Sequence, residues 1–191
     1  MNVPLPDADI SFFPHFIDLA KSKALALLLF EQLDWRQDEI TMYGRKVTIP
    51  RLQAWYGDQG TDYTYSKLTM KPLMWTDELN YLKQQLHLKT GVAFNSVLAN
   101  CYRNHRDSVS WHSDNEPELG NEPVIASISL GAERYFHLKH KYKSLSHKLK
   151  LPSGSLLIMK GKTQENWQHA VLKSRIESPM RVNLTFRKII K

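Results

Sequence analysis

The sequence has little cysteine, no long apolar run and a deficit of acidic residues. Cys101 is the only cysteine among 191 residues, which excludes an internal disulfide and indicates a reducing, intracellular compartment. The most apolar run, residues 24–30, is much shorter than the roughly 20 residues of a membrane-spanning helix. The first residues lack the basic start and apolar stretch of a secretory signal. We therefore expect a protein that is neither secreted nor inserted in a membrane.

Basic residues outnumber acidic ones, 26 to 19, which gives a net charge of +7. This balance suits a polyanionic partner, although charge alone identifies none. Apolar residues make up 42% and charged residues 24% of the chain, as in ordinary globular proteins. There is no repeat, low-complexity tract or linker. We expect one domain over residues 1–191 with a real core, present as a monomer.

Hydrophobic periodicity predicts two helices in the first half of the chain. Residues 18–34 form the first, opened by Asp18, and its predicted apolar face consists of Ala20, Ala24, Leu27 and Leu28. Residues 76–91 form the second, which ends at Gly91. The aromatic and basic stretch 44–66 between them favours hairpins and loops.

From residue 94 the pattern changes to short β-rich runs. These runs are 94–102, 124–132, 134–140, 148–161, 167–172 and 181–190. The Pro-Ser-Gly sequence at 152–154 predicts a hairpin. Two helices followed by a series of strands indicate an α+β protein, and we favour a jelly-roll sandwich with its core in residues 92–191.

The last run is the most informative strand. Alternation places Arg181, Asn183, Thr185 and Arg187 on one face. This polar face either lies in water or points two guanidinium groups into a cavity that holds an anion, and periodicity alone favours water. In residues 94–102, Asn100 and Tyr102 share a face with Leu98, whereas Cys101 points the other way and is expected to be a core residue.

A metal site is suggested by three separated residues. His112 and Asp114 share a face if their segment is extended, and His169 lies on a later strand. Two histidines and one carboxylate form the facial triad of non-haem Fe(II) oxygenases. With eight histidines in the chain, such a combination arises easily, and a zinc hydrolase could use the same ligands. His137, His140 and His147 lie among lysines and are expected to form a solvated basic face.

Several stretches together resemble one family. They are WHSDNEPELG (111–120), PVIASISLGAERYF (123–136), GSLLIMKG (154–161), NWQH (166–169) and RVNLTFRKI (181–189). In this order they resemble the AlkB family of Fe(II)/2-oxoglutarate-dependent nucleic-acid demethylases, especially the repair branch with eukaryotic homologues two and three. The likeness runs from residue 50 to nearly the C-terminus. It implies a double-stranded β-helix core with N-terminal helices and a nucleotide-recognition lid within residues 1–91. It also implies a cytoplasmic protein in a bacterium or a nuclear one in a eukaryote.

The resemblance implies roles for the residues of the site. His112, Asp114 and His169 would bind Fe(II), and Arg181 would hold the distal carboxylate of 2-oxoglutarate. The remaining residues of that pocket would be Asn100, Tyr102, Arg187, Leu98 and Asn183, although Asn183 is expected mainly to satisfy internal hydrogen bonds. With O2, the enzyme would demethylate N1-methyladenine and N3-methylcytosine in DNA, with RNA as a second substrate. The products would be formaldehyde, succinate and CO2.

The resemblance also suggests residues that contact the substrate. Tyr65 would stack on the flipped base, Tyr63 and Trp55 supply further rings, and Arg51 would contact a phosphate. A core role for Trp55 is at least as well supported. Glu116 would favour a cationic, methylated base. Asn115 departs from the second aspartate that relatives usually carry here, which leaves the choice of lesion open.

Residues 41–47 resemble the hairpin that one duplex-acting homologue inserts into the base stack, with Met42 and Tyr43 as the wedge. We expect the Tyr43→Ala variant to lose far more activity on double-stranded than on single-stranded oligonucleotides, because only the duplex needs a wedge. Formaldehyde release on both substrates measures this. An equal loss on the two would contradict the wedge.

Two other functions remain open. The chain could be a related dioxygenase that acts mainly on RNA or on a protein side chain, or a non-catalytic nucleic-acid-binding jelly roll. The second is disfavoured because every expected iron and 2-oxoglutarate position is filled. Formaldehyde release that depends on both Fe(II) and 2-oxoglutarate separates these classes.

Overall fold

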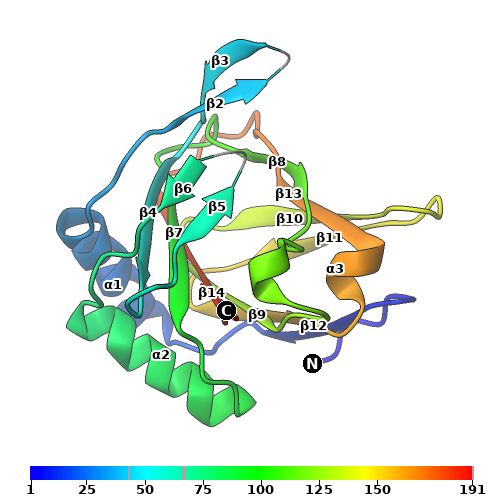
Figure 1. Cartoon of the computed structure of the whole chain (residues 1–191), viewed down its shortest axis with the longest axis horizontal. Coiled ribbons are helices and arrows are strands. Elements are labelled where there is room, and N and C mark those ends of the chain that lie inside the picture. Colours follow the sequence, from blue (N-terminus) through cyan, green and yellow to red (C-terminus); the bar gives the residue numbers. More distant parts are fainter. Residues whose placement is uncertain (43, 66–67, 191) are drawn as a thin grey trace.

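Two antiparallel sheets face each other in this computed structural model (Figure 1). It describes residues 1–42, 44–65 and 68–190, without the side chains of 40–42, 63–65 and 68–69. The larger sheet has the order β1 (Asp9–Phe13), β12 (Ser155–Lys160), β9 (Ile125–Gly131), β14 (Arg181–Arg187), β7 (Ser96–Tyr102) and β4 (Leu52–Gly57). The smaller has the order β11 (Ser146–Leu151), β10 (Arg134–His140), β13 (Trp167–Val171) and β8 (Val109–His112). This arrangement confirms the jelly-roll expectation.

Helices cover the outer face of the larger sheet, and two hairpins extend from it (Figure 1). The helices are α1 (Leu19–Gln32) and α2 (Asp77–Thr90), with the short α3 (Thr163–Asn166) and the 3-10 turn η1 (Pro117–Leu119) near β13. The hairpins are β2 (Glu39–Met42) with β3 (Arg45–Thr48), and β5 (Tyr63–Tyr65) with β6 (Leu68–Met70). They overlap the stretch 44–66 for which hairpins are predicted, but β2 lies before it and β6 after it.

Both predicted helices form at the predicted places because the capping residues at their ends act as the sequence predicts. The Asp18 side chain accepts the Lys21 backbone N–H at 2.8 Å and caps α1. Gly91 ends α2 in the left-handed region at φ 73°, which glycine adopts without steric cost. Local chemistry therefore sets the ends of both helices.

The predicted apolar face of α1 is wrong. The helix buries Ser22, Ala26 and Leu29, whereas Ala20 and Ala24 are exposed. Leu27 is 61% and Leu28 37% exposed. Residues 24–30 are apolar all round the helix, so the 3.6-residue period cannot select the buried stripe. Packing selects it instead: Ser22 Oγ lies 2.8 Å from Ser153 Oγ in the loop before β12.

We expect the Leu29→Ala variant to be less stable by about 2–5 kcal/mol, since Leu29 is fully buried and its truncation leaves a cavity. The Leu27→Ala variant is the matched control, and its free energy of unfolding should change by less than about 0.5 kcal/mol. Urea unfolding of both variants measures the difference. Equal destabilisation of the two would contradict the observed helix face.

Three further features differ from the prediction. The turn at 152–154 joins two sheets and is not a hairpin, because β11 pairs with β10 while β12 pairs with β1 and β9. No strand is predicted before residue 18, yet β1 forms an edge of the larger sheet. The jelly roll is therefore not confined to residues 92–191, since β1 and β4 both extend it. A turn signal shows where the chain reverses direction, but it does not show whether the strands on either side of the turn pair with each other.

The two faces of β14 explain how the site is placed. Val182, Leu184 and Phe186 are fully buried and pack with α1 and α2 in one core. The alternate residues point into the space between the two sheets, and all seven residues of the strand are buried. The polar face of β14 thus lies inside the protein, as the cavity interpretation requires.

Cys101 faces the helix side of β7. It is fully buried, and burial raises the pKa of its thiol to about 12. It is therefore an inert core residue, as predicted.

Among the described residues, no helix is long and apolar enough to cross a membrane.

Candidate active site

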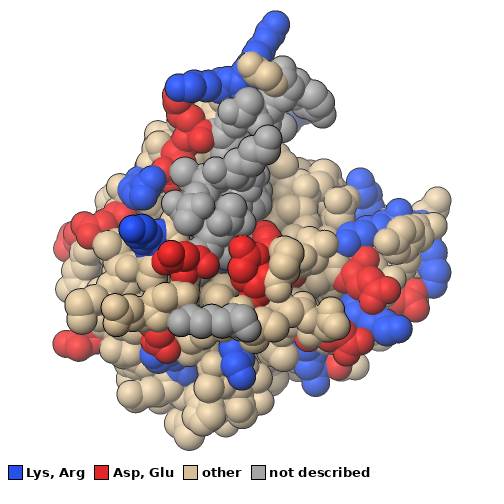
Figure 2. All heavy atoms as spheres, viewed as in Figure 1, with Lys and Arg blue, Asp and Glu red and all other residues tan. Residues whose placement is uncertain are grey.

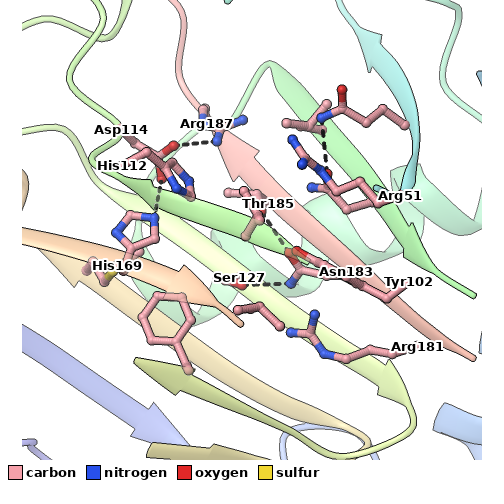
Figure 3. Close-up of a pocket in the computed structure, with 17 residues that line it drawn as sticks. Arg51, Tyr102, His112, Asp114, Ser127, His169, Arg181, Asn183, Thr185 and Arg187 are labelled. Carbon is pink, nitrogen blue, oxygen red and sulfur yellow. Dashed lines mark hydrogen bonds and ion pairs between the residues drawn. The ribbon is translucent and has the colours of Figure 1, made fainter. Parts of the chain in front are cut away.

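His112, Asp114 and His169 converge between the two sheets (Figure 3). Their potential ligand atoms all lie within 4.8 Å of one another. The sheet brings them together because His169 on β13 is the registered partner of His112 on β8. Asp114 follows two residues after His112, and its Oδ2 lies 3.7 Å from His169 Nε2. Two imidazoles and one carboxylate form the donor set that suits Fe(II) and leaves further coordination positions open.

The protonation of these residues also suits metal binding. Burial lowers the pKa of His169 to about 3, with a further contribution from His112, so its imidazole is neutral near pH 7. Burial alone would raise the pKa of Asp114, but Arg187 and the two histidines outweigh it and hold the pKa at about 2. The carboxylate is therefore ionised, and a neutral imidazole beside it has a lone pair to donate.

A hydrogen bond orients His112, and a ring contact orients His169. His112 Nδ1 lies 2.8 Å from the Ser110 carbonyl oxygen. Because a carbonyl only accepts, Nδ1 is the donor in this contact, and Nε2 is the nitrogen left to face a metal. The His169 ring stacks on Phe136 with centroids 5.0 Å apart.

The segment that carries Asp114 is tied to the elements that carry His169. The Asp114 backbone N–H donates to Gln164 Oε1 at 2.9 Å, and Gln164 belongs to α3, just before β13. Ser113 Oγ donates to the Trp167 carbonyl at 2.8 Å. These contacts of residues 113 and 114 fix the carboxylate relative to α3 and β13.

A buried arginine lies at the other end of the same pocket (Figure 3). Arg181 is 1% exposed, and its Nη2 donates to Ser129 Oγ at 2.9 Å. Its Nε and Nη1 have no hydrogen-bond partner among the described residues. A buried guanidinium with two such donors is costly unless an anion binds there. A dicarboxylate such as 2-oxoglutarate, with one end on Arg181 and the other at the metal cluster, fits this arrangement.

The amide of Asn100 is held in one orientation. Its Oδ1 accepts hydrogen bonds from Arg51 Nε at 2.8 Å and from Gln53 Nε2 at 3.2 Å. The Asn100 Nδ2 group is left as the donor toward a ligand. Arg51 is only 5% exposed and lines the pocket, so the predicted surface phosphate contact does not fit its position.

The remaining predicted residues of the 2-oxoglutarate pocket are also present in its wall. Leu98 and Tyr102 line it, and Arg187 joins it to the metal cluster by donating from Nη2 to Asp114 Oδ1 at 2.6 Å. The Asn183 amide donates to Ser127 Oγ at 2.8 Å and accepts from Thr185 Oγ1 at 3.2 Å. Its hydrogen bonds are therefore internal, in agreement with the main expectation for this residue.

The structure places the predicted substrate residues less favourably. Trp55 is 3% exposed and donates to the Thr61 carbonyl at 2.9 Å, which agrees with the core alternative for this residue. Asn115 is exposed and lines a separate pocket with residues of α3. Glu116 Oε2 is buried with no hydrogen-bond partner among the described residues.

Other predicted contacts fall where no side chain is described. The backbones of Tyr63, Tyr65 and Met42 lie in the two hairpins, but the positions of their side chains are not part of the structure. Tyr43 lies outside the described residues altogether. Their roles stay predictions.

Some pocket residues are missing from the sequence prediction. Ser127 and Ser129 are buried, line or adjoin the pocket and contact Asn183 and Arg181. Their even spacing in an otherwise apolar strand was an available signal, since it matches the alternation of β14. Gln53, Phe136 and Met159 also line the pocket, and no local pattern marks them.

Comparison with known proteins agrees with this geometry. The family model described as the 2OG-Fe(II) oxygenase superfamily matches residues 9–187. The Bos taurus and Homo sapiens proteins named alpha-ketoglutarate-dependent dioxygenase alkB homolog 3 are 42% and 41% identical over 92% and 94% of this chain. The chain spans 64% and 66% of their lengths. The Homo sapiens DNA oxidative demethylase ALKBH2 is 38% identical over 88% of this chain and 70% of that protein.

Solved structures show the same fold at lower identity. The structure of OsALKBH1 covers 97% of this chain and 100% of its own, with a TM-score of 0.63 and 17% identity. A prolyl-4-hydroxylase from Pseudomonas putida covers 94% of this chain and 92% of its own, with a TM-score of 0.55 and 14% identity. At these identities the likeness concerns the fold alone.

Proposed function

The chain belongs to the AlkB family within the 2OG-Fe(II) oxygenase superfamily, and from this premise we propose that it oxidatively demethylates N-alkylated bases in nucleic acid. The observation that carries the proposal is the buried His112–Asp114–His169 cluster, which shares one pocket with the incompletely paired Arg181. The relatives' names support the substrate class. DNA is the proposed first substrate and RNA the second.

Each residue of the pocket has a defined task in this proposal. His112, Asp114 and His169 would hold the metal, and Arg181 would bind the distal carboxylate of 2-oxoglutarate through its Nε and Nη1 donors. Asn100 Nδ2 would donate to the other end of the same molecule, because Arg51 and Gln53 fix the amide. Arg187 neutralises and positions Asp114.

When bound, Fe(II) with 2-oxoglutarate and O2 supplies the oxidation of a methyl group on a base nitrogen, giving succinate, CO2 and formaldehyde. The protein supplies position and a dry environment. Phe136, Leu98 and Val171 form apolar parts of the pocket wall, which limit the access of water to the reacting groups.

The modified base must leave the stack to reach this pocket. We propose Tyr65 as the ring on which it stacks, with Tyr63 nearby. Glu116 is the proposed reader of its charge, since a carboxylate favours a cationic, methylated base over the neutral product.

The test is formaldehyde release from oligonucleotides that contain N1-methyladenine or N3-methylcytosine, as single-stranded DNA, duplex DNA and RNA. We expect release that requires both Fe(II) and 2-oxoglutarate and yields one succinate per formaldehyde. Tight binding without release would support a non-catalytic binder instead. Succinate formation stimulated only by a protein substrate would support the protein-directed alternative.

A further inference from the structure

The smaller sheet presents one face to the interior and the other to solvent. Along β10, Phe136 and Leu138 are buried, whereas Tyr135 and Lys139 are exposed and His137 is half-buried. On β11, Lys148 is the registered partner of His137, and Lys150 is the registered partner of Tyr135. On β8, the side chain of Trp111 points outward. This surface, called the lysine–aromatic face below, consists of Trp111, Tyr135, His137, Lys139, Lys148 and Lys150.

Rings and ammonium groups alternate on the lysine–aromatic face. Three rings form a row across β8 and β10: the Trp111–His137 centroids are 6.5 Å apart and the His137–Tyr135 centroids 6.4 Å. Lys139 Nζ lies 5.0 Å from the Trp111 ring centroid, and Lys148 Nζ lies 3.7 Å from that of Tyr135. Each end of the row therefore carries a cation.

This combination of groups suits a single nucleic-acid strand. Aromatic rings accept any base by stacking, and lysines between them contact the phosphates. Open β-sheet faces bind single strands in this manner in other proteins. Lysines alone would serve to keep the edge strand β11 from pairing with another chain, but that task needs no row of rings, of which Tyr135 is exposed and Trp111 and His137 are half-buried. In Figure 2, basic side chains at the β10–β11 end of the molecule lie among acidic ones.

The lysine–aromatic face begins directly behind the metal cluster. Trp111 precedes His112, and alternation places their side chains on opposite faces of β8. Because β8 is the edge strand of its sheet, a strand that leaves the pocket can pass around this edge to reach Trp111. From β8 to β11 the sheet is about 15 Å wide, which accommodates a few nucleotides.

From these contacts we infer that the lysine–aromatic face binds the single strand that flanks the modified base. Tyr135 and Trp111 stack on bases, and Lys139 and Lys148 contact phosphates. Lys150 contributes less because its Nζ is paired with Glu133 Oε1 at 3.1 Å. The inference rests on the proposed nucleic-acid substrate and adds the path of the strand outside the pocket.

The test compares the wild type with two variants, Lys139→Ser/Lys148→Ser and Tyr135→Ser. Binding of a single-stranded oligonucleotide of about fifteen nucleotides is measured by fluorescence anisotropy at several salt concentrations. We expect the double variant to bind roughly tenfold more weakly at low salt. Its log–log salt slope should be shallower by about 1.4, because each phosphate contact on a single strand contributes about 0.7. The Tyr135→Ser variant should bind about tenfold more weakly with the salt slope nearly unchanged.

Matched controls lie on the helical side of the molecule. Lys21 Nζ is 4.6 Å from the Tyr81 ring centroid and Lys89 Nζ is 4.2 Å from that of Phe13. The Lys21→Ser/Lys89→Ser variant removes the same charge as the double variant of the face. Tyr81 is 44% exposed and Tyr135 is 40% exposed, so Tyr81→Ser is the control for Tyr135→Ser. We expect the control variants to bind like the wild type. All variants should demethylate a methylated trinucleotide with unchanged kcat and KM, since it is too short to reach the face.

Two results would overturn the inference while leaving the proposed function intact. One is demethylation by the wild type combined with equal oligonucleotide binding by the face variants and the controls. The other is a loss of binding only to vesicles of anionic lipid, which would assign the face to a membrane surface. A wild type that neither binds nor demethylates any oligonucleotide would overturn the proposed function and the inference together.

Discussion

The Asp114→Asn variant is expected to lose iron binding and with it more than about 99% of formaldehyde release. The substitution removes the only carboxylate of the cluster, and even partners one step removed from a metal ligand change affinity or activity by about 10–100-fold. It also removes the negative charge that Arg187 contacts at 2.6 Å in a buried site. Metal content by mass spectrometry and the rate of formaldehyde release measure the effect.

Asp107 provides the control for this variant. It is 5% exposed and accepts from Arg103 Nε at 2.8 Å, so the Asp107→Asn variant also removes a buried carboxylate that pairs with an arginine. We expect it to lower the melting temperature but to bind one iron per chain. Iron binding by the Asp114→Asn variant at the level of the wild type would contradict the proposed metal site.

The second large effect is expected at Arg181. The Arg181→Lys variant keeps a positive charge but cannot present two parallel N–H donors to a carboxylate. We expect the KM for 2-oxoglutarate to rise by about 10- to 100-fold, in line with the ~1.5–3 kcal/mol of a hydrogen bond to a charged group. The KM for the oligonucleotide should not change. Calorimetric titration of 2-oxoglutarate into Mn(II)-loaded protein measures the same loss without turnover.

Arg134 is the matched residue for this experiment. It is also buried, at 5% exposed, but its guanidinium donates to the backbone carbonyls of Asn104, Asp107 and Leu172. The Arg134→Lys variant should therefore be less stable and should retain the wild-type affinity for 2-oxoglutarate. An Arg181→Lys variant whose affinity for 2-oxoglutarate matches that of the wild type would contradict the anchor.

The interior of the site could be predicted because it lies on strands with strict alternation. In β14 the two-residue period assigned Arg181 and Arg187 to one face, and that face points into the pocket between the two sheets. The resemblance to the AlkB family then chose the anion cavity over a solvated face, which the period alone could not do. The resemblance also identified His169 as the third ligand, because the separation of His112 and His169 in the sequence does not show that they are paired on neighbouring strands.

Alternation could not predict which face of α1 is buried, or that Trp55 and Arg51 are buried. In α1, apolar residues surround the helix, so the choice of Leu29 over Leu27 depends on contacts with β9 and β14 rather than on the local sequence. The sequence left a substrate contact open for Arg51 and Trp55, although it supported a core role for Trp55 at least as well. They are buried because β4 pairs with β7 as an edge of the larger sheet, a pairing that no local signal specifies.

The most direct measurement is a crystal structure grown without oxygen in the presence of Fe(II) and 2-oxoglutarate. One ferrous ion should be bound by the side chains at positions 112, 114 and 169, with the far carboxylate of the keto acid on the guanidinium at position 181. An ion bound elsewhere, or a keto acid turned away from that guanidinium, would contradict the assignment of this pocket.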